Sequence, residues 1–219
     1  MSDSLLRYPQ LDRYYQRFLT EENSAEFIQS VSQRYSMGTL ERLAQYGQRR
    51  TRRAAILAIG FLGTFDNNET LGRALSDDDR AVRMLAEHGA RQIWQRQGTP
   101  GQQVQLQALY RFNDQGRSEE AVSLATEMIG YDRNLGEAWS QRGIALCALG
   151  EFADAVVDCR ETLQCNRFHF PAAMGLAHCC LQLDEMSGAL AGFRLALNIN
   201  PDLDGVRAQI SKLERLLEN

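Results

Sequence analysis

The stretch that decides the fold spans residues 136–166 and reads GEAWSQRGIALCALGEFADAVVDCRETLQCN. Its two apolar segments of helical period flank a short break at Gly150, which is typical of a helix hairpin. Similar residues return 34 positions earlier and 34 positions later. The columns with this spacing are Ala121, Ala155 and Ala189; Ile129, Leu163 and Leu197; Asp132, Asn166 and Asn200; Phe112, Leu146 and Cys180; Ala125, Cys159 and Phe193. A fixed period of this length predicts stacked helix hairpins.

The breaks inside the hairpins carry turn residues. Gly116 and Gly150 suit the left-handed residue that follows a helix end, and the third break reads Leu183-Asp184-Glu185. The recurring Ala lets the two helices of a hairpin cross closely, because a larger side chain would push their axes apart.

The 34-residue unit resembles the tetratricopeptide repeat (TPR). The middle unit carries the resemblance in Trp139-x2-Arg142-Gly143-x2-Leu146, followed by Gly150, Phe152 and Ala155. Arg142 replaces the usual Leu, and Leu146 replaces the usual aromatic residue. Three such units cover about residues 102–203, and the stretch 203–217 is predicted to be a capping helix with a polar face.

The first half repeats at a spacing of 31 residues. Thr39-Leu40-Glu41-Arg42 returns as Thr70-Leu71-Gly72-Arg73, and two units over residues 37–96 resemble short HEAT-like repeats. Residues 5–36 are expected to form a helical capping unit, and residues 97–101, Gln-Gly-Thr-Pro-Gly, form the break. The prediction is an all-α solenoid of stacked antiparallel hairpins, with a HEAT-like domain at 1–98 and a TPR-like domain at 99–219.

Composition excludes several classes of protein. The chain has 219 residues and a formal net charge of −4, which argues against a general nucleic-acid binder. Lys212 is the only lysine, so a phosphate-binding P-loop has no candidate. The N-terminus shows no signal peptide, no stretch reaches the length of a membrane span, and five cysteines in helical segments fit a reducing compartment. We therefore expect a cytoplasmic protein that needs no cofactor or metal.

The resemblance implies a binding site on the first helix of each hairpin, where the family receives a peptide or a helix. The positions that match its groove are Gln103, Leu106, Tyr110 and Asn113; Glu137, Ser140, Ile144 and Cys147; Pro171, Met174, His178 and Leu181. This lining is mostly apolar, which favours an amphipathic helix or an apolar segment. The alternatives are that the N-terminal helices of this chain fill the groove, or that its apolar residues belong to the core. Some family members clamp a terminal carboxylate with basic and Asn residues. Here Leu106, Tyr110, Pro171 and Gly175 stand at those positions, which argues against that ligand.

A second candidate site is the cluster Arg49, Arg50, Arg52 and Arg53, which could contact an acidic partner. The competing interpretation pairs Arg52 and Arg53 with Asp77, Asp78 and Asp79, a run that reads as a turn and a helix N-cap.

Metal and enzyme signatures are weak. Cys165, His169, His178 and Cys179 lack the paired spacing of a zinc site. Asp154 and Asp158 are expected on a solvated helix face, and Trp94 and Trp139 in the core. The sequence favours a non-enzymatic scaffold. One alternative is an enzyme or accessory subunit of the HEAT-like bilin-lyase or DNA-glycosylase type, and another is self-association through the solenoid ends.

Overall fold

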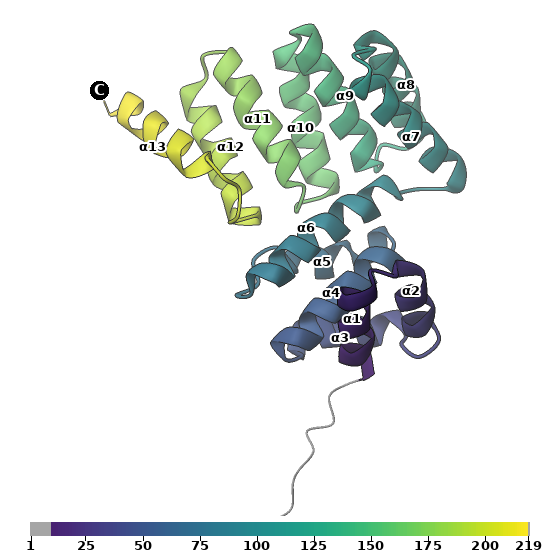
Figure 1. Cartoon of the computed structure of the whole chain (residues 1–219). Coiled ribbons are helices and arrows are strands. Elements are labelled where there is room, and N and C mark those ends of the chain that lie inside the picture. The colour runs from purple at the N-terminus through teal and green to yellow at the C-terminus, as the bar shows by residue number, and fades with distance from the viewer. Residues whose placement is uncertain (1–9, 219) are drawn as a thin grey trace, which may run out of the picture. The chain divides into compact units, whose positions relative to one another are not determined.

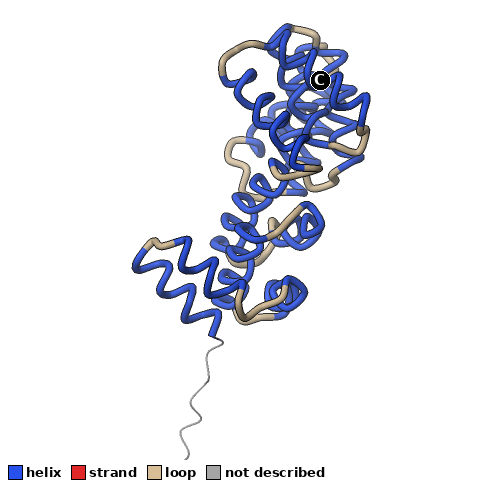
Figure 2. The backbone as a smooth tube through the Cα atoms, turned by 90° about the vertical axis from the view of Figure 1, so that its right-hand side faces the viewer, coloured by secondary structure: helices blue, strands red, loops and turns tan. Residues whose placement is uncertain are grey.

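The computed structural model describes residues 10–218, which form helices joined by short loops and contain no strand (Figures 1 and 2). The helices are α1 (Gln10–Glu21), α2 (Ser24–Ser32), α3 (Met37–Tyr46), α4 (Arg49–Leu62), η1 (Phe65–Asn67), α5 (Asn68–Ala74), α6 (Arg80–Gln95), α7 (Pro100–Asp114), α8 (Ser118–Tyr131), α9 (Gly136–Leu149), α10 (Phe152–Cys165), α11 (Phe170–Gln182), α12 (Met186–Ile199) and α13 (Val206–Leu217). The predicted all-α solenoid is confirmed.

The chain divides into two compact units between Trp94 and Gln95. We call them the N-terminal and the C-terminal unit. The predicted domain limits, 1–98 and 99–219, stay a prediction. Residues 1–9 and 219 lie outside the described part of the chain, and with them the predicted leaderless N-terminus and the start of the capping unit expected from residue 5.

The C-terminal unit is a stack of hairpins in chain order (Figure 1). Each helix from α7 to α13 packs against the next one, and α9 also packs against both α7 and α11. The first helices of the three hairpins therefore lie in one layer. The columns of small residues explain the close packing, because Ala121, Ala155 and Ala189 are fully buried between helices.

The three hairpins turn in the same way. Gly116, Gly150 and Asp184 all have positive φ, at 70°, 82° and 59°. In each turn the following N–H closes a six-residue ring back to the helix. These bonds run from Arg117, Glu151 and Glu185 to the carbonyls of Phe112, Leu146 and Cys180, at 2.8, 2.9 and 2.8 Å. The predicted left-handed glycines are confirmed, and Asp184 takes the third position.

The 34-residue column of Asp132, Asn166 and Asn200 forms the links after the hairpins. Each side-chain oxygen accepts the backbone N–H two residues later, at 3.0, 3.1 and 3.1 Å. Such local turns satisfy backbone donors that a helix end leaves without partners. Each repeat therefore contains two turns, and each of these turns has the same hydrogen bonds in all three repeats.

The N-terminal unit contains the hairpins α1/α2 and α3/α4, followed by α5 and α6. Helices α3 and α5 lie 31 residues apart in sequence, as do α4 and α6, in agreement with the spacing of the repeat. A Cβ added at Gly60 would lie 3.0 Å from the Cα of Gly89, so α4 and α6 cross at a point where both need glycine. The HEAT-like assignment stays a prediction.

Candidate interaction surfaces

The residues predicted to bind a partner lie on α7, α9 and α11, which share one layer. Their exposure differs widely. Leu106 is fully buried, and Glu137 and Ser140 are buried as well. The accessible or half-buried members are Gln103, Tyr110, Asn113, Ile144, Cys147, Pro171, Met174, His178 and Leu181. We call these nine residues the α7–α9–α11 face. Leu106 belongs to the core of the first hairpin and is left out of it.

The α7–α9–α11 face rests on a buried polar network around Glu137. The Tyr110 hydroxyl donates a hydrogen bond to Oε1 of Glu137. The Gln141 amide donates to the same oxygen at 3.0 Å, and Nε2 of His169 lies 3.3 Å from Oε2. Nδ1 of His169 accepts the Ala172 N–H at 3.0 Å, which leaves the Nε2 proton free to bond Glu137. The network therefore joins all three hairpins through one carboxylate.

The charge of Glu137 is stabilised despite its burial. Burial acts to raise the pKa of Glu137, but the hydrogen bonds from His169, Tyr110 and Gln141 outweigh it and lower that pKa. A buried carboxylate that accepts several hydrogen bonds is held in one position. Glu137 therefore holds its partners in position behind the α7–α9–α11 face. Sequence spacing alone had predicted that it lies on that surface.

The character of the α7–α9–α11 face changes along the stack. At the α7 end, the Asn113 amide donates to the carbonyl and Oε1 of Gln141, at 3.0 and 2.9 Å. Toward α11, Ile144 is 50% exposed, and Met174 and Leu181 are half-buried and pack against the core formed by helices α9 to α13. The predicted apolar lining thus describes the α9 and α11 end, whereas α7 offers polar groups.

Helix α13 continues the same register. Val206 and Leu213 are buried 34 residues after Ala172 and Cys179, which are also buried. Lys212 therefore follows His178 in the column that begins at Tyr110 and Ile144. Lys212 is exposed, as predicted for the capping helix.

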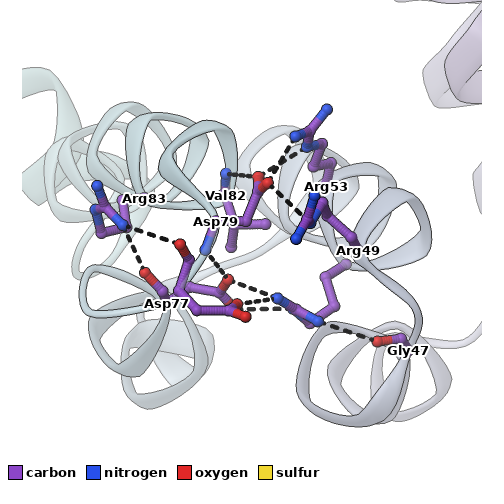
Figure 3. A network of polar contacts seen from close by, with 9 residues as sticks. Gly47, Arg49, Arg53, Asp77, Asp79, Val82 and Arg83 are labelled. Atoms are coloured by element: carbon purple, nitrogen blue, oxygen red, sulfur yellow. Dashed lines mark hydrogen bonds and ion pairs between the residues drawn. The ribbon is translucent and has the colours of Figure 1, made fainter.

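The arginine cluster of the N-terminal unit is largely occupied by internal ion pairs (Figure 3). Arg52 makes two bonds to Asp77, at 2.7 and 2.8 Å, and also contacts Asp78. Arg53 makes two bonds to Asp79, at 2.6 and 2.8 Å. This confirms the pairing interpretation, because carboxylates of the same chain hold both guanidiniums.

Asp79 contacts Arg49, Arg53 and the start of α6. Its Oδ1 caps α6 by accepting the Val82 N–H at 3.0 Å, and Arg49 approaches its Oδ2 at 3.4 Å. The hydrogen bonds from Arg53 lower the pKa of Asp79 to about 2 from an ordinary value of 3.8. The predicted N-cap is confirmed. Arg49 is 70% exposed at its side chain, and Arg50 is exposed and bonds Gln16, so contact of these arginines with an acidic partner stays a prediction.

The residue that departs from the repeat pattern, Arg142, has a specific partner. It makes two bonds of 2.8 Å to the carboxylate of Asp158, and its guanidinium lies 4.8 Å from the centre of the Trp139 ring. Asp158 is buried, so the prediction of a solvated face is wrong for this residue, whereas Asp154 is exposed. The carboxylate is inaccessible because Arg142 of the neighbouring helix covers it. Trp94 and Trp139 are buried, as predicted.

The candidate metal residues do not converge. Among residues 10–218 no group of three or more His, Cys, Asp or Glu side chains could hold a metal ion. His169 caps α11 and faces Glu137, and the ring of exposed His178 contacts Phe193, with 5.2 Å between ring centres. No helix in the described part of the chain is long and apolar enough to cross a membrane.

Comparison with known proteins identifies the fold of the stack. No protein-family model and no curated protein matches the chain. Among solved structures, the chain is similar to the first TPR domain of Spaghetti (RPAP3) bound to the HSP90 peptide SRMEEVD, with 21% identity and a TM-score of 0.50. The match covers 53% of this chain and 92% of the other. The C-terminal unit has the TPR fold. Its three TPR hairpins are α7/α8, α9/α10 and α11/α12.

Proposed function

We propose that the C-terminal unit is a non-enzymatic scaffold that captures a peptide segment of a partner protein on the α7–α9–α11 face. The observation that supports this most is the apolar exposure at α9 and α11, where Ile144, Met174 and Leu181 lie over a stack of rigid hairpins. A preorganised surface loses little ordering entropy on binding, and exposed apolar groups gain by burial.

The partner that fits has apolar side chains over Ile144 and Met174 and acidic residues toward Lys212. Lys212 is exposed and makes no ion pair within the described residues, so an acidic residue there would gain a charge partner. The HSP90 peptide SRMEEVD, which is bound to the first TPR domain of RPAP3, has acidic residues toward its C-terminal end. Pro171 and Gly175 supply no cation at the matching clamp positions in this chain, so we do not extend the capture of a terminal carboxylate to it.

A peptide-display selection against the whole protein tests this function. We expect enriched sequences in which two or three apolar residues precede Asp or Glu. Affinity for a selected peptide should then fall at least tenfold in Ile144→Asp, because a charge would be buried against apolar groups. Val157 on α10 is also 50% exposed, so Val157→Asp is the matched control and should bind normally. Equal losses in both variants, or no enrichment at all, would reject the proposal.

Two further measurements test the competing interpretations. Light scattering over a concentration series separates a second copy of this chain from a foreign peptide as the occupant. A bound chromophore in the absorbance spectrum, or a shift of duplex DNA on a gel, would favour the enzyme or accessory-subunit alternative.

A further inference from the structure

Two thiols meet between successive repeats of the C-terminal unit. Sγ of Cys147 on α9 lies 2.7 Å from Sγ of Cys179 on α11. The two residues stand 32 positions apart in sequence, and both helices belong to the layer that carries the α7–α9–α11 face. Cys147 is half-buried and belongs to that face, whereas Cys179 is only 1% exposed behind it. One thiol is therefore within reach of a small molecule, and the other is within reach of the first.

The other three cysteines have different surroundings. Cys165 bonds the carbonyl of Arg133 at 3.5 Å, and Cys180 bonds Oε2 of Glu185 at 3.7 Å. Burial raises the pKa of Cys159 to about 12, so this thiol stays protonated and unreactive. Proximity and access thus single out one pair of the five thiols.

We propose that Cys147 and Cys179 form a thiol–disulfide exchange site that takes a small-molecule disulfide such as oxidised glutathione. The thiolate of Cys147 attacks one sulfur of that disulfide, so a mixed disulfide forms and one thiolate leaves. Cys179 then loses its proton and attacks Sγ of Cys147, which releases the second thiolate. The protein loses two protons and two electrons, and the small disulfide is reduced to two thiols.

The second step determines the pH dependence of the reaction. Burial and the contact with Cys147 raise the pKa of Cys179, so little thiolate forms at neutral pH. Closure should therefore accelerate as the pH rises. Once formed, the bond ties the first helix of the second repeat to that of the third and removes the Cys147 thiol from the α7–α9–α11 face.

The test uses the full chain and oxidised glutathione at pH 8. Denaturation and alkylation without reductant should show three reactive thiols of the five, and the intact mass should fall by about two hydrogen atoms. The melting temperature of the oxidised protein should rise by about 5 °C, because the cross-link restricts the unfolded chain. Cys159→Ser and Cys180→Ser should form the same bond.

Cys147→Ala and Cys179→Ala should keep all their remaining thiols free of internal bonds, and Cys179→Ala should stop at the mixed disulfide on Cys147. Ala suits position 179, because Ala145 stands at the same place in the preceding repeat. Five alkylated thiols, a lasting glutathione adduct in the unaltered protein, or an internal bond that survives Cys147→Ala would overturn the proposal. An effect of oxidation on peptide affinity rests on the proposed function, whereas thiol counts do not, so the two can fail separately.

Discussion

Both units satisfy their charged residues internally, but they do so in different places. In the N-terminal unit, Arg52 and Arg53 look like a basic patch in sequence, but Asp77 and Asp79 neutralise them in space. In the C-terminal unit, the charge of Glu137 lies buried behind a surface that stays accessible. The comparison teaches that a charge cluster becomes a binding site only when its own chain does not satisfy it, and that the satisfied clusters here hold the hairpins together.

The largest expected effect concerns the buried pair of the C-terminal unit. Asp158→Ala should lower the free energy of unfolding by about 3 kcal/mol, because it leaves Arg142 partly buried without its partner. Urea unfolding followed by Trp139 fluorescence measures this, since Trp139 packs against Arg142. Asp154→Ala, one turn earlier and exposed, should change the value by less than about 0.5 kcal/mol. Similar values for the two variants would contradict the assigned role.

The corresponding pair in the N-terminal unit should matter somewhat less. Asp79→Ala removes the α6 cap and the bonds to Arg53, with an expected loss of about 2 kcal/mol. Asp79→Asn keeps a good N-cap residue and should recover about 1 kcal/mol. Trp94 reports on this unit, since its indole donates to Asn68 at 2.7 Å. If both variants unfold alike, the cap contributes nothing.

Acid should expose the same difference. Because the pKa of Asp79 is lower in the folded state than its ordinary 3.8, its contribution is present above pH 4 and lost as pH falls toward 2. With discounting for solvent screening, we expect a loss on the order of 1 kcal/mol in this window. Asp79→Asn should flatten that part of the Trp94 unfolding profile. An unchanged profile would argue against the depressed pKa.

The smallest effect distinguishes the repeats from one another. Asp184 occupies a left-handed turn position that Gly116 and Gly150 fill in the other hairpins. Asp184→Gly should stabilise the C-terminal unit by about 0.5 kcal/mol, because glycine adopts this conformation without a steric penalty. Gly150→Ala should destabilise it by about 1 kcal/mol, since no side chain lies within 4 Å to add a clash. Thermal melts of both variants check the signs.

The sequence predicted what the 34-residue period determines. The hairpins, their glycine turns and the buried Ala column follow from the period, since equivalent residues repeat equivalent contacts. The period also predicted which residues of α7, α9 and α11 share one face, but not how exposed each residue is. Glu137 is covered by His169 of the next repeat, and Leu106 is covered by the core of its own hairpin, so a spacing rule for one helix missed both.

Contacts between unlike positions were also beyond the pattern. Asp158, on the second helix of the hairpin, contacts Arg142 on the first. The one signal in the sequence was that Arg142 replaces the usual Leu. Cys147 and Cys179 occupy different positions in their repeats, so no column connects them. The first pairing depends on how the two helices of one hairpin cross, and the second on how far one hairpin is rotated against the next, neither of which the sequence states.

Photo-crosslinking tests the central claim most directly. A photoreactive amino acid at position 144 or at position 157, each 50% exposed in the unaltered protein, is irradiated with a display-selected peptide. We predict a covalent adduct from position 144, with suppression by excess unlabelled peptide, and none from position 157. An adduct at 157 alone, or equal adducts at both positions, would contradict capture on the α7–α9–α11 face.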